Sequence, residues 1–326
     1  MYLIDFTNKR DVTGVKDKVE LMDSKEYLRY LVKKLFQVHQ GKKIYGQRDG
    51  DYAFPASSKP MSKRAKMEPM IKTYDIPSEE RTSNTTDFFV DDINNINSVG
   101  LLNIVKTDGS DDDCTASVIR TNNGNIAITA AHCIFDHNLQ TWNTNLYFFP
   151  GYNNNAPGRV GKVYAYKSFI WGDFRQDITR FDYGFIKFYY PEGRKLQDDT
   201  GAFDYDLVIP QGNVPATVFG YPGDNSGDFV NCPKDGQHLC QWQGDSFDFP
   251  STLPNYEWYR GINVDVGYGS SGGPWLRNYD PNTNAGNVMG ISHGILYEPY
   301  PDFSTASWAW HQDDFANLLQ YAENSQ

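Results

Sequence analysis

From about Ser98 onward, the sequence consists of short runs of β-branched and aromatic residues that Asn, Gly, Asp and Pro interrupt. Such runs, bounded by turn-forming residues, are typical of strands. Ser117–Ile119 and Ile126–Ile128 flank Asn122-Asn123-Gly124, which predicts a hairpin because Asn-Gly readily supplies the positive φ of a tight turn. The spacing of the runs favours a β-barrel or a β-sandwich. The other predicted strands are Tyr183–Tyr189, Ala216–Tyr221 and Val288–Ile295.

Helical periodicity is confined to two segments. Residues 23–40 predict an amphipathic helix that Asp23 or Ser24 can cap and that Gly41 ends. Apolar residues near the end of the chain predict a second helix over Trp308–Glu323. The Gly, Pro, Ser and Lys-rich stretch from Gly41 to Arg81 is typical of a loosely ordered connector that is open to proteolysis.

The net charge of −11 is divided unevenly along the 326 residues. Residues 1–81 hold 17 Lys and Arg against 12 Asp and Glu, whereas the remainder holds 13 against 29. The basic segment could therefore dock on the acidic body, although two independently solvated surfaces would have the same composition. An acidic body repels phosphates, so nucleic acid is not expected as a partner. The chain contains no apolar run of the roughly 20 residues that a membrane span needs.

The four cysteines form two pairs that are each local in the sequence. Neither pair has the Cys-x-x-Cys spacing of a zinc or redox site, so we expect the disulfides Cys114–Cys133 and Cys232–Cys240. Disulfides indicate an oxidising compartment, and we expect secretion. Met1–Arg10 lacks the apolar stretch of a signal peptide, so the signal is absent from this chain or the protein is not exported.

The segment Gly269-Ser270-Ser271-Gly272-Gly273-Pro274 surrounds a serine with glycines. A Gly- and Ser-rich sequence usually forms only a loop. Glycines also let the backbone bend sharply, however, which exposes a hydroxyl and turns N–H groups toward one point. A serine nucleophile needs those donors and an adjacent base.

His132 is the candidate base, because it follows a predicted strand within Thr129-Ala130-Ala131-His132-Cys133. The expected Cys114–Cys133 disulfide would fix the loop that carries it. Asp182 precedes an apolar strand and could orient the imidazole and stabilise its charged form. Asp177 is the alternative carboxylate, but no comparable strand follows it.

Together these segments resemble the chymotrypsin-type serine peptidases, including the glutamyl endopeptidases and trypsin-like secreted relatives. The order His, Asp, Ser is that of this family and differs from the orders in subtilisins and α/β-hydrolases. Cys114–Ile119, Phe219-Gly220-Tyr221-Pro222 and Val288–Gly294 are similar to strands of the family. The resemblance extends from about Ser98 to the C-terminus.

The resemblance implies an all-β fold of two six-stranded antiparallel barrels with a C-terminal helix, preceded here by a partly helical N-terminal segment. We expect this segment at residues 1–81, the first barrel with His132 and Asp182 at 82–200, and the second barrel with Ser271 at 201–326. The backbone N–H groups of Gly269 and Ser271 would form the oxyanion hole. No cofactor and no metal are implied, and we expect a monomer acting on protein or peptide substrates.

Ser270 departs from the trypsin pattern, which has an Asp before the nucleophile to pair with the new N-terminus. Activation must then differ, and we hypothesise that residues 1–81 are an inhibitory propeptide cut near Arg81 or elsewhere before Ser98. A plain N-terminal domain is the alternative.

The resemblance leaves the substrate preference open. Asp265 lies six residues before Ser271, where trypsin-like members place the carboxylate that binds Lys or Arg, but Gly267 replaces a flanking cysteine. Ser292-His293-Gly294 would bind substrate, and His293 lies near the histidine with which acid-specific members bind Glu. A Lys or Arg preference, an acidic or broad preference, and a non-catalytic homologue acting as a binding module are the competing functions.

Overall fold

The computed structural model describes residues 67–76, 96–176, 181–208, 210–225, 227, 229–248, 259–296, 304–308 and 312–326. The predicted helix at 23–40 lies outside the described residues, as does the predicted boundary at residue 81.

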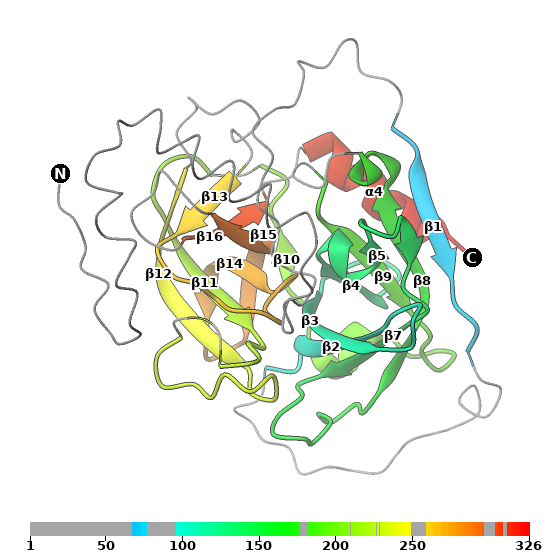
Figure 1. Cartoon of the computed structure of the whole chain (residues 1–326), viewed down its shortest axis with the longest axis horizontal. Helices are drawn as coiled ribbons and strands as arrows, with labels where there is room; N and C mark the ends of the chain where they lie inside the picture. The colour runs from blue at the N-terminus through cyan, green and yellow to red at the C-terminus, as the bar shows by residue number, and fades with distance from the viewer. Residues whose placement is uncertain are drawn as a thin grey trace, which may run out of the picture. The chain divides into compact units, whose positions relative to one another are not determined.

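The first barrel is a closed antiparallel sheet (Figure 1). Within the described residues, its sheet has seven strands in the order β1-β8-β7-β2-β3-β4-β9, and pairing of β8 with β9 closes six of them into a barrel. Strand β1 lies outside this ring, on the edge of β8. The strands are β1 (Pro69–Thr73), β2 (Val99–Val105), β3 (Asp111–Val118), β4 (Ile126–Thr129), β7 (Asn145–Pro150), β8 (Val163–Trp171) and β9 (Gly184–Phe188).

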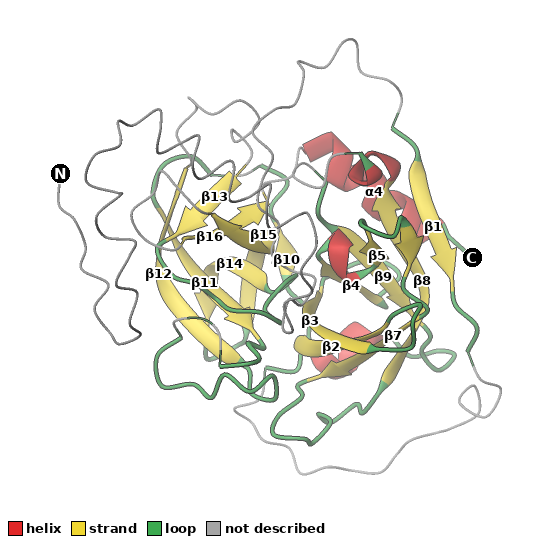
Figure 2. Ribbon diagram, in the orientation of Figure 1, coloured by secondary structure: helices red, strands yellow, loops and turns green. Residues whose placement is uncertain are grey.

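The second barrel repeats this plan (Figure 2). Its described residues give the order β10-β15-β14-β11-β12-β13-β16, and pairing of β15 with β16 closes a ring of six, while β10 pairs in parallel with β15. The all-β prediction with two six-stranded barrels is therefore confirmed. The strands are β10 (Asp204–Tyr205), β11 (Val214–Gly220), β12 (Cys240–Asp248), β13 (Tyr259–Ile262), β14 (Pro274–Asp280), β15 (Ala285–Leu296) and β16 (Ser304–Trp308).

The predicted hairpin is present, because β3 and β4 pair with Ser117 opposite Ile128 and Val118 opposite Ala127. Gly124 takes a φ of 79° in the connection. The three further predicted strands correspond to β9, β11 and β15. The remaining elements are the short strands β5 (Phe135–Asp136) and β6 (Thr141–Trp142), the 3-10 helices η1 (Ala131–Cys133) and η2 (Gly172–Arg175), and the helices α3 (Leu196–Thr200) and α4 (Gln312–Asn324).

The terminal helix begins four residues later than predicted. Helix α4 starts at Gln312, because Trp308 belongs to β16 and pairs with Tyr259 of β13. Its apolar face packs on the first barrel, where the ring of Phe315 stacks on that of Tyr183 at a centroid distance of 6.0 Å. Among the described residues, none of the helices combines the length and the apolar character that crossing a membrane requires.

The connector predicted between Gly41 and Arg81 contains an ordered strand, which corrects that prediction. All five residues of β1 pair with β8, from Pro69 opposite Trp171 to Thr73 opposite Lys167. Tyr74 and Ile76 follow the strand and are buried. Because β7 pairs with only the first part of β8, the rest of that edge is open to β1.

Candidate active site

His132 lies in η1, immediately after β4, where the first barrel faces the second. The predicted disulfide between Cys114 of β3 and Cys133 is formed, and so is the Cys232–Cys240 disulfide in the second barrel. The carbonyl of Cys133 also accepts a hydrogen bond of 3.0 Å from the Asn143 side chain. These bonds fix the loop that carries His132.

Asp182 directly precedes β9, and its carboxylate contacts His132 twice. Oδ1 accepts the backbone N–H of His132 at 2.8 Å, and Oδ2 lies 2.7 Å from His132 Nδ1. Only 1% of the Asp182 side chain is exposed. An ionised carboxylate can only accept, so the His132 proton is on Nδ1 and Nε2 is left as the basic nitrogen. The structure thus brings these two predicted residues together, whereas Asp177 lies outside the described residues.

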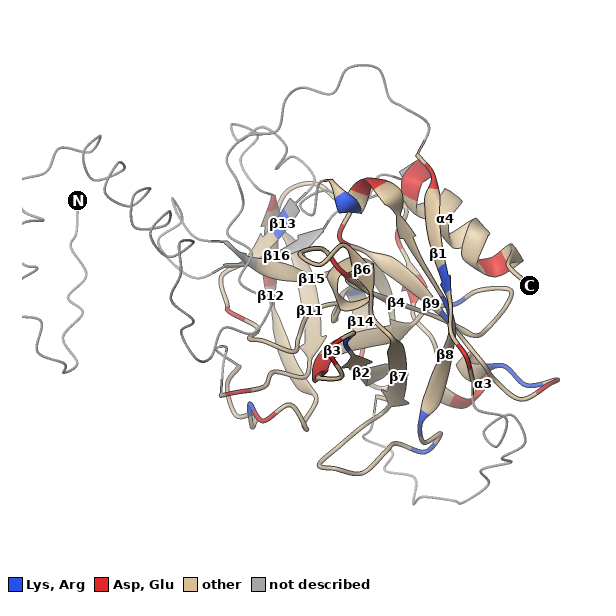
Figure 3. Ribbon diagram, turned by 45° about the vertical axis from the view of Figure 1, so that its right-hand side comes forward, with Lys and Arg blue, Asp and Glu red and all other residues tan. Residues whose placement is uncertain are grey.

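The negative charge of Asp182 and the positive charge of protonated His132 stabilise each other. Burial acts against the charge of His132, but the charge and hydrogen bond of Asp182 outweigh it, so the pKa of His132 is raised above 6.5. Asp112 adds to this effect from the acidic start of β3, which is red in Figure 3. Burial acts against the charge of Asp182 too, yet the two histidines beside it hold its pKa well below the ordinary range.

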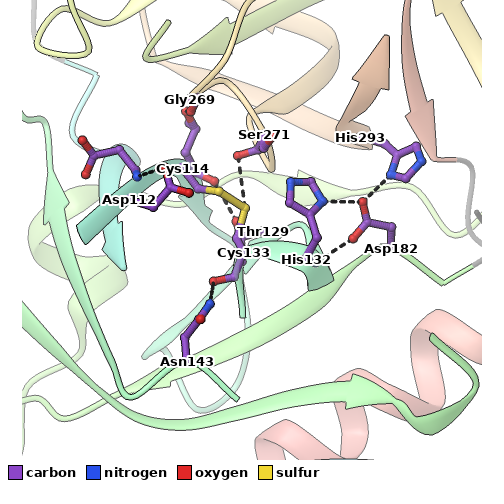
Figure 4. The surroundings of a disulfide bond; sticks show 12 residues. Asp112, Cys114, Thr129, His132, Cys133, Asn143, Asp182, Gly269, Ser271 and His293 are labelled. Atoms are coloured by element: carbon purple, nitrogen blue, oxygen red, sulfur yellow. Dashed lines mark hydrogen bonds and ion pairs between the residues drawn. A yellow bond between two sulfur atoms is a disulfide. The ribbon is translucent and has the colours of Figure 1, made fainter. Parts of the chain in front are cut away.

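His293 is the second histidine beside Asp182. Its Nδ1 hydrogen-bonds to Oδ2 of Asp182, the oxygen that also faces His132 Nδ1. Figure 4 shows the His132 ring between Ser271 and Asp182, with His293 on the other side of the carboxylate. Sequence reasoning singled out His293 for contact with substrate and missed this contact. The only local signal is its place next to Ser292 on a predicted strand.

The serine loop, residues 269–273, is tied to the second barrel on one side. The N–H of Gly272 donates to the Ser292 carbonyl at 2.7 Å, and the N–H of Ser292 donates to the Gly273 carbonyl at 2.9 Å. Gly269 and Gly272 both have positive φ, at 86° and 78°. This conformation favours glycine, as the sequence suggested.

Thr115 of β3 ties the serine loop to the first barrel, a role that sequence reasoning missed. Its N–H donates to the Ser271 carbonyl at 2.8 Å, and its hydroxyl donates to the Gly269 carbonyl at 2.9 Å. The same hydroxyl accepts the N–H of Tyr221 at 3.0 Å. The only sequence signal is its position after Cys114.

Gly272 packs closely against the first barrel at this junction. A Cβ atom there would lie 2.1 Å from Thr129 Oγ1, 2.5 Å from the Thr115 carbonyl oxygen and 2.7 Å from the Ala130 nitrogen. Two of these are backbone atoms that cannot rotate away. Any side chain at Gly272 would therefore push the serine loop away from the first barrel.

The two residues that sequence reasoning singled out around Ser271 occupy defined positions. Ser270 is fully buried, and its hydroxyl donates to the Val266 carbonyl at 2.6 Å. Asp265 is half-buried, and its Oδ1 accepts the N–H of Gly267 at 2.7 Å. Asp265 thus shapes the turn that leads into the serine loop.

His132, Asp182 and His293 are of types that can hold a metal ion, and their donor atoms lie within 4.8 Å of one another. However, the 2.7 Å between His132 Nδ1 and Asp182 Oδ2 is a hydrogen-bond distance. The arrangement therefore fits shared protons better than a bound ion.

No family model matches the chain. A curated relative, the glutamyl endopeptidase of Bacillus licheniformis, is 33% identical over 105 residues. This match spans 30% of the chain and 30% of the relative, so the chain matches less than a third of that protein.

Solved structures match over most of the chain. The protease Anisep from Arthrobacter nicotinovorans has a TM-score of 0.59 at 21% identity, covering 71% of this chain and 98% of its own. A thermostable serine protease, AL20, from an extremophilic microorganism has a TM-score of 0.57 at 22% identity, covering 71% and 99%. A Glu endopeptidase has a TM-score of 0.52 at 16% identity, covering 72% and 95%. The chain therefore has the fold that these three proteases share.

Proposed function

We propose that the protein is a serine endopeptidase that hydrolyses peptide bonds through an acyl-enzyme. The observation that carries the proposal is the buried pair of His132 and Asp182, joined by two hydrogen bonds of 2.7 and 2.8 Å beside the serine loop. A buried carboxylate that fixes the tautomer of a histidine is the arrangement that serine nucleophiles use on several folds. The likeness to a glutamyl endopeptidase supports the same reading.

The mechanism assigns one task to each group. Ser271 Oγ attacks the carbonyl carbon of the scissile bond while Nε2 of His132 removes the hydroxyl proton. The negative oxygen of the tetrahedral intermediate accepts the N–H groups of Gly269 and Ser271. His132 then protonates the leaving amine, and the C–N bond breaks to leave an ester on Ser271. A water molecule then attacks this ester while His132 removes its proton. His132 passes that proton to Ser271 Oγ as the acyl group leaves.

Substrate preference is the finer part of the proposal. Asp265 favours Lys or Arg before the scissile bond if its carboxylate reaches the substrate side chain while Oδ1 holds Gly267. A preference for Glu or Asp is the competing proposal, supported by the name of the matched relative. In that case Ser292 and Gly294, rather than His293, would face the substrate, because His293 contacts Asp182.

The N-terminal segment is proposed as an inhibitory propeptide of a secreted enzyme, in keeping with the two disulfides. Because β1 pairs with β8 along five residues, we expect the segment to stay bound after a cut near Arg81. Sequencing of the new N-terminus and gel filtration of the cut protein test this. Full activity of the uncut chain would contradict inhibition.

Cleavage of a peptide library by the full chain, before and after incubation, tests the activity. We expect Ser271→Ala to lower kcat by about 10⁶-fold, since removal of the nucleophile leaves only the other groups of the site. Equal cleavage by Ser271→Ala and the parent protein would contradict the proposal and leave a binding module as the alternative.

The same library resolves the preference. Asp265→Ser should abolish cleavage after Lys and Arg if that preference holds. Asp108→Ser, in the exposed turn between β2 and β3, is the matched control. An unchanged profile in Asp265→Ser, with cleavage after Glu, would favour the acidic preference.

A further inference from the structure

Asp182 is held by hydrogen bonds from two histidines that belong to different barrels. His132 follows β4 of the first barrel, whereas His293 lies on β15 of the second. Both ring Nδ1 atoms face Oδ2 of Asp182, and the backbone N–H of His132 donates to Oδ1. The carboxylate thus lies in the middle of a His–Asp–His array that crosses the junction between the barrels (Figure 4).

An irregularity in β15 turns His293 toward this carboxylate. Ser292 pairs with Ser307 of β16, but Gly294 pairs with Ala306, so the register shifts at His293. The preceding residue, Ser292, is held by its backbone and by its side chain. Its backbone is hydrogen-bonded to the serine loop, and its hydroxyl accepts Trp275 Nε1–H at 3.0 Å. The strand that carries His293 is therefore the strand that holds the serine loop.

Burial determines where the protons of the array lie. The side chains of Asp182 and His293 are 1% and 2% exposed. A buried carboxylate is costly unless its oxygens receive hydrogen bonds, and it can only accept them when ionised. Both histidines therefore carry a proton on Nδ1, and Oδ2 is shared between them.

We propose that His293 is a positioning residue that holds Asp182 in line with His132. It acts on the reaction only through Asp182, so the proposal rests on the proposed function. Without the donor on His293, Oδ2 would keep only His132 Nδ1 among these contacts, and Asp182 could rotate away from the geometry that fixes the base. His293 also links the serine loop to the base. Its strand β15 is bonded to the serine loop, and its side chain is bonded to Asp182, the carboxylate that orients His132.

Two substitutions separate the hydrogen bond from the ring. His293→Asn keeps an N–H donor near the position of Nδ1, whereas His293→Phe keeps a ring without a donor. We expect His293→Phe to lower kcat roughly tenfold, as loss of a supporting hydrogen bond does at other sites, while KM changes little. His293→Asn should retain most of the activity. His238→Phe is the matched control, because His238 forms a partly exposed pair with Asp235 away from the site.

The pH profile gives a readout that a purely structural role would not move. The charged groups that act on His132 are Asp182, Asp112 and Lys106, with the His293 ring centroid 6.4 Å away. Loss of the His293 donor leaves more of the Asp182 charge to act on His132, which favours the imidazolium form. The acid limb of kcat/KM should therefore move to higher pH in His293→Phe and stay in place in His293→Asn.

Nuclear magnetic resonance of histidine-¹⁵N-labelled protein tests the array without reference to activity. We expect protons on Nδ1 of both His132 and His293 in the parent protein and in Ser271→Ala, with only the His132 signal left in His293→Phe and His293→Asn. A His293 Nδ1 without a proton would overturn the proposal, even if the substituted proteins fail to fold. An unchanged kcat and pH profile in a folded His293→Phe would also overturn it. Activity that survives Ser271→Ala would instead contradict the proposed function and leave the array in place.

Discussion

The two barrels support their halves of the site in different ways. In the first barrel, His132 and Asp182 lie directly at the ends of strands whose inner face is apolar, and a disulfide and helix α4 brace those strands. In the second barrel, Ser271 lies on a loop whose shape depends on positive-φ glycines. That loop also receives hydrogen bonds from Thr115 of the first barrel.

The second barrel also contains a buried arginine. Arg260 of β13 is 1% exposed, and its guanidinium binds Asp248, the Ser246 side chain and the carbonyls of Pro210 and Gly212. The base receives its direct hydrogen bonds from Asp182 of its own barrel, whereas the serine loop is bonded both to Ser292 of its own barrel and to Thr115 of the other. Substitutions can test each half separately.

Loss of the carboxylate should have the largest effect on activity. We expect Asp182→Asn to lower kcat by about 10⁴-fold, because an amide accepts at only one of the two oxygen positions. It cannot accept both the backbone N–H and the Nδ1–H of His132, and would leave His132 in the wrong tautomer. Asp136→Asn, at the end of β5 where its Oδ1 accepts the exposed N–H of Leu139, should leave kcat unchanged. Steady-state kinetics of both proteins measure this, and a loss below tenfold in Asp182→Asn would show that the first barrel does not fix the base in this way.

Gly272→Ala should separate the barrels where the serine loop packs against the first barrel. We expect it to destabilise the protein by about 3 kcal/mol and to remove most of the activity, because its Cβ meets backbone atoms that cannot move. Gly109→Ala is the matched control, with a φ of 82° but nothing within 4 Å of the added Cβ, and should cost only about 1 kcal/mol. Urea unfolding gives both values. Equal losses would show that φ alone matters and that the junction is loose.

Thr115→Val removes the hydroxyl that joins the barrels but keeps the backbone N–H. The change leaves the buried N–H of Tyr221 without its acceptor, which costs about 1–3 kcal/mol, and frees the Gly269 carbonyl. We expect a roughly tenfold lower kcat through misplacement of the serine loop. Thr144→Val, which removes an exposed hydroxyl bonded to Val105, should change neither quantity. A Thr115→Val protein with unchanged kcat would mean that the serine loop is positioned without the Thr115 hydroxyl.

The pH dependence should give the smallest effect and should differ between activity and stability. Activity needs neutral His132, whose pKa is raised, so the acid limb of kcat/KM should lie above pH 6.5. Stability behaves oppositely. The raised pKa of His132 stabilises the fold below pH 6.5 and this contribution is lost as pH rises through the folded pKa, whereas the lowered pKa of Asp182 stabilises it above pH 3.8.

The pair should thus stabilise the fold most between these two values, on the acid side of the activity maximum. Urea unfolding of the parent protein and of His132→Gln at pH 5 and pH 8 checks this. The parent should lose stability toward pH 8 relative to the variant. An equal pH response in both would contradict the raised pKa of His132.

The local features of the fold could be predicted from the sequence because their contacts are local. The β3–β4 hairpin and both disulfides join residues close together in the chain. His132 and Asp182 were singled out by the predicted strands beside them, and the order of three motifs in the resemblance supported both. The structure gives the lengths of the two hydrogen bonds between them, and the catalytic roles are proposed from this geometry.

The remainder depended on contacts between distant segments. The sequence of β1 predicts a connector, because the segment is short and begins with Pro69. The segment forms a strand because it can pair with the open edge of β8. The direction of His293 follows from a register shift between β15 and β16, which no periodicity in Val288–Ile295 reveals. Helix α4 started later than predicted because Trp308 pairs with β13.

The most direct test of the central claim is covalent labelling of Ser271 by a fluorophosphonate, with the modified peptide identified by mass spectrometry. We expect stoichiometric labelling of Ser271 in the full chain or in its cleaved form, and slow labelling when His132 is replaced by Ala. Absence of label on Ser271 in both forms, or equal labelling with and without His132, would contradict it.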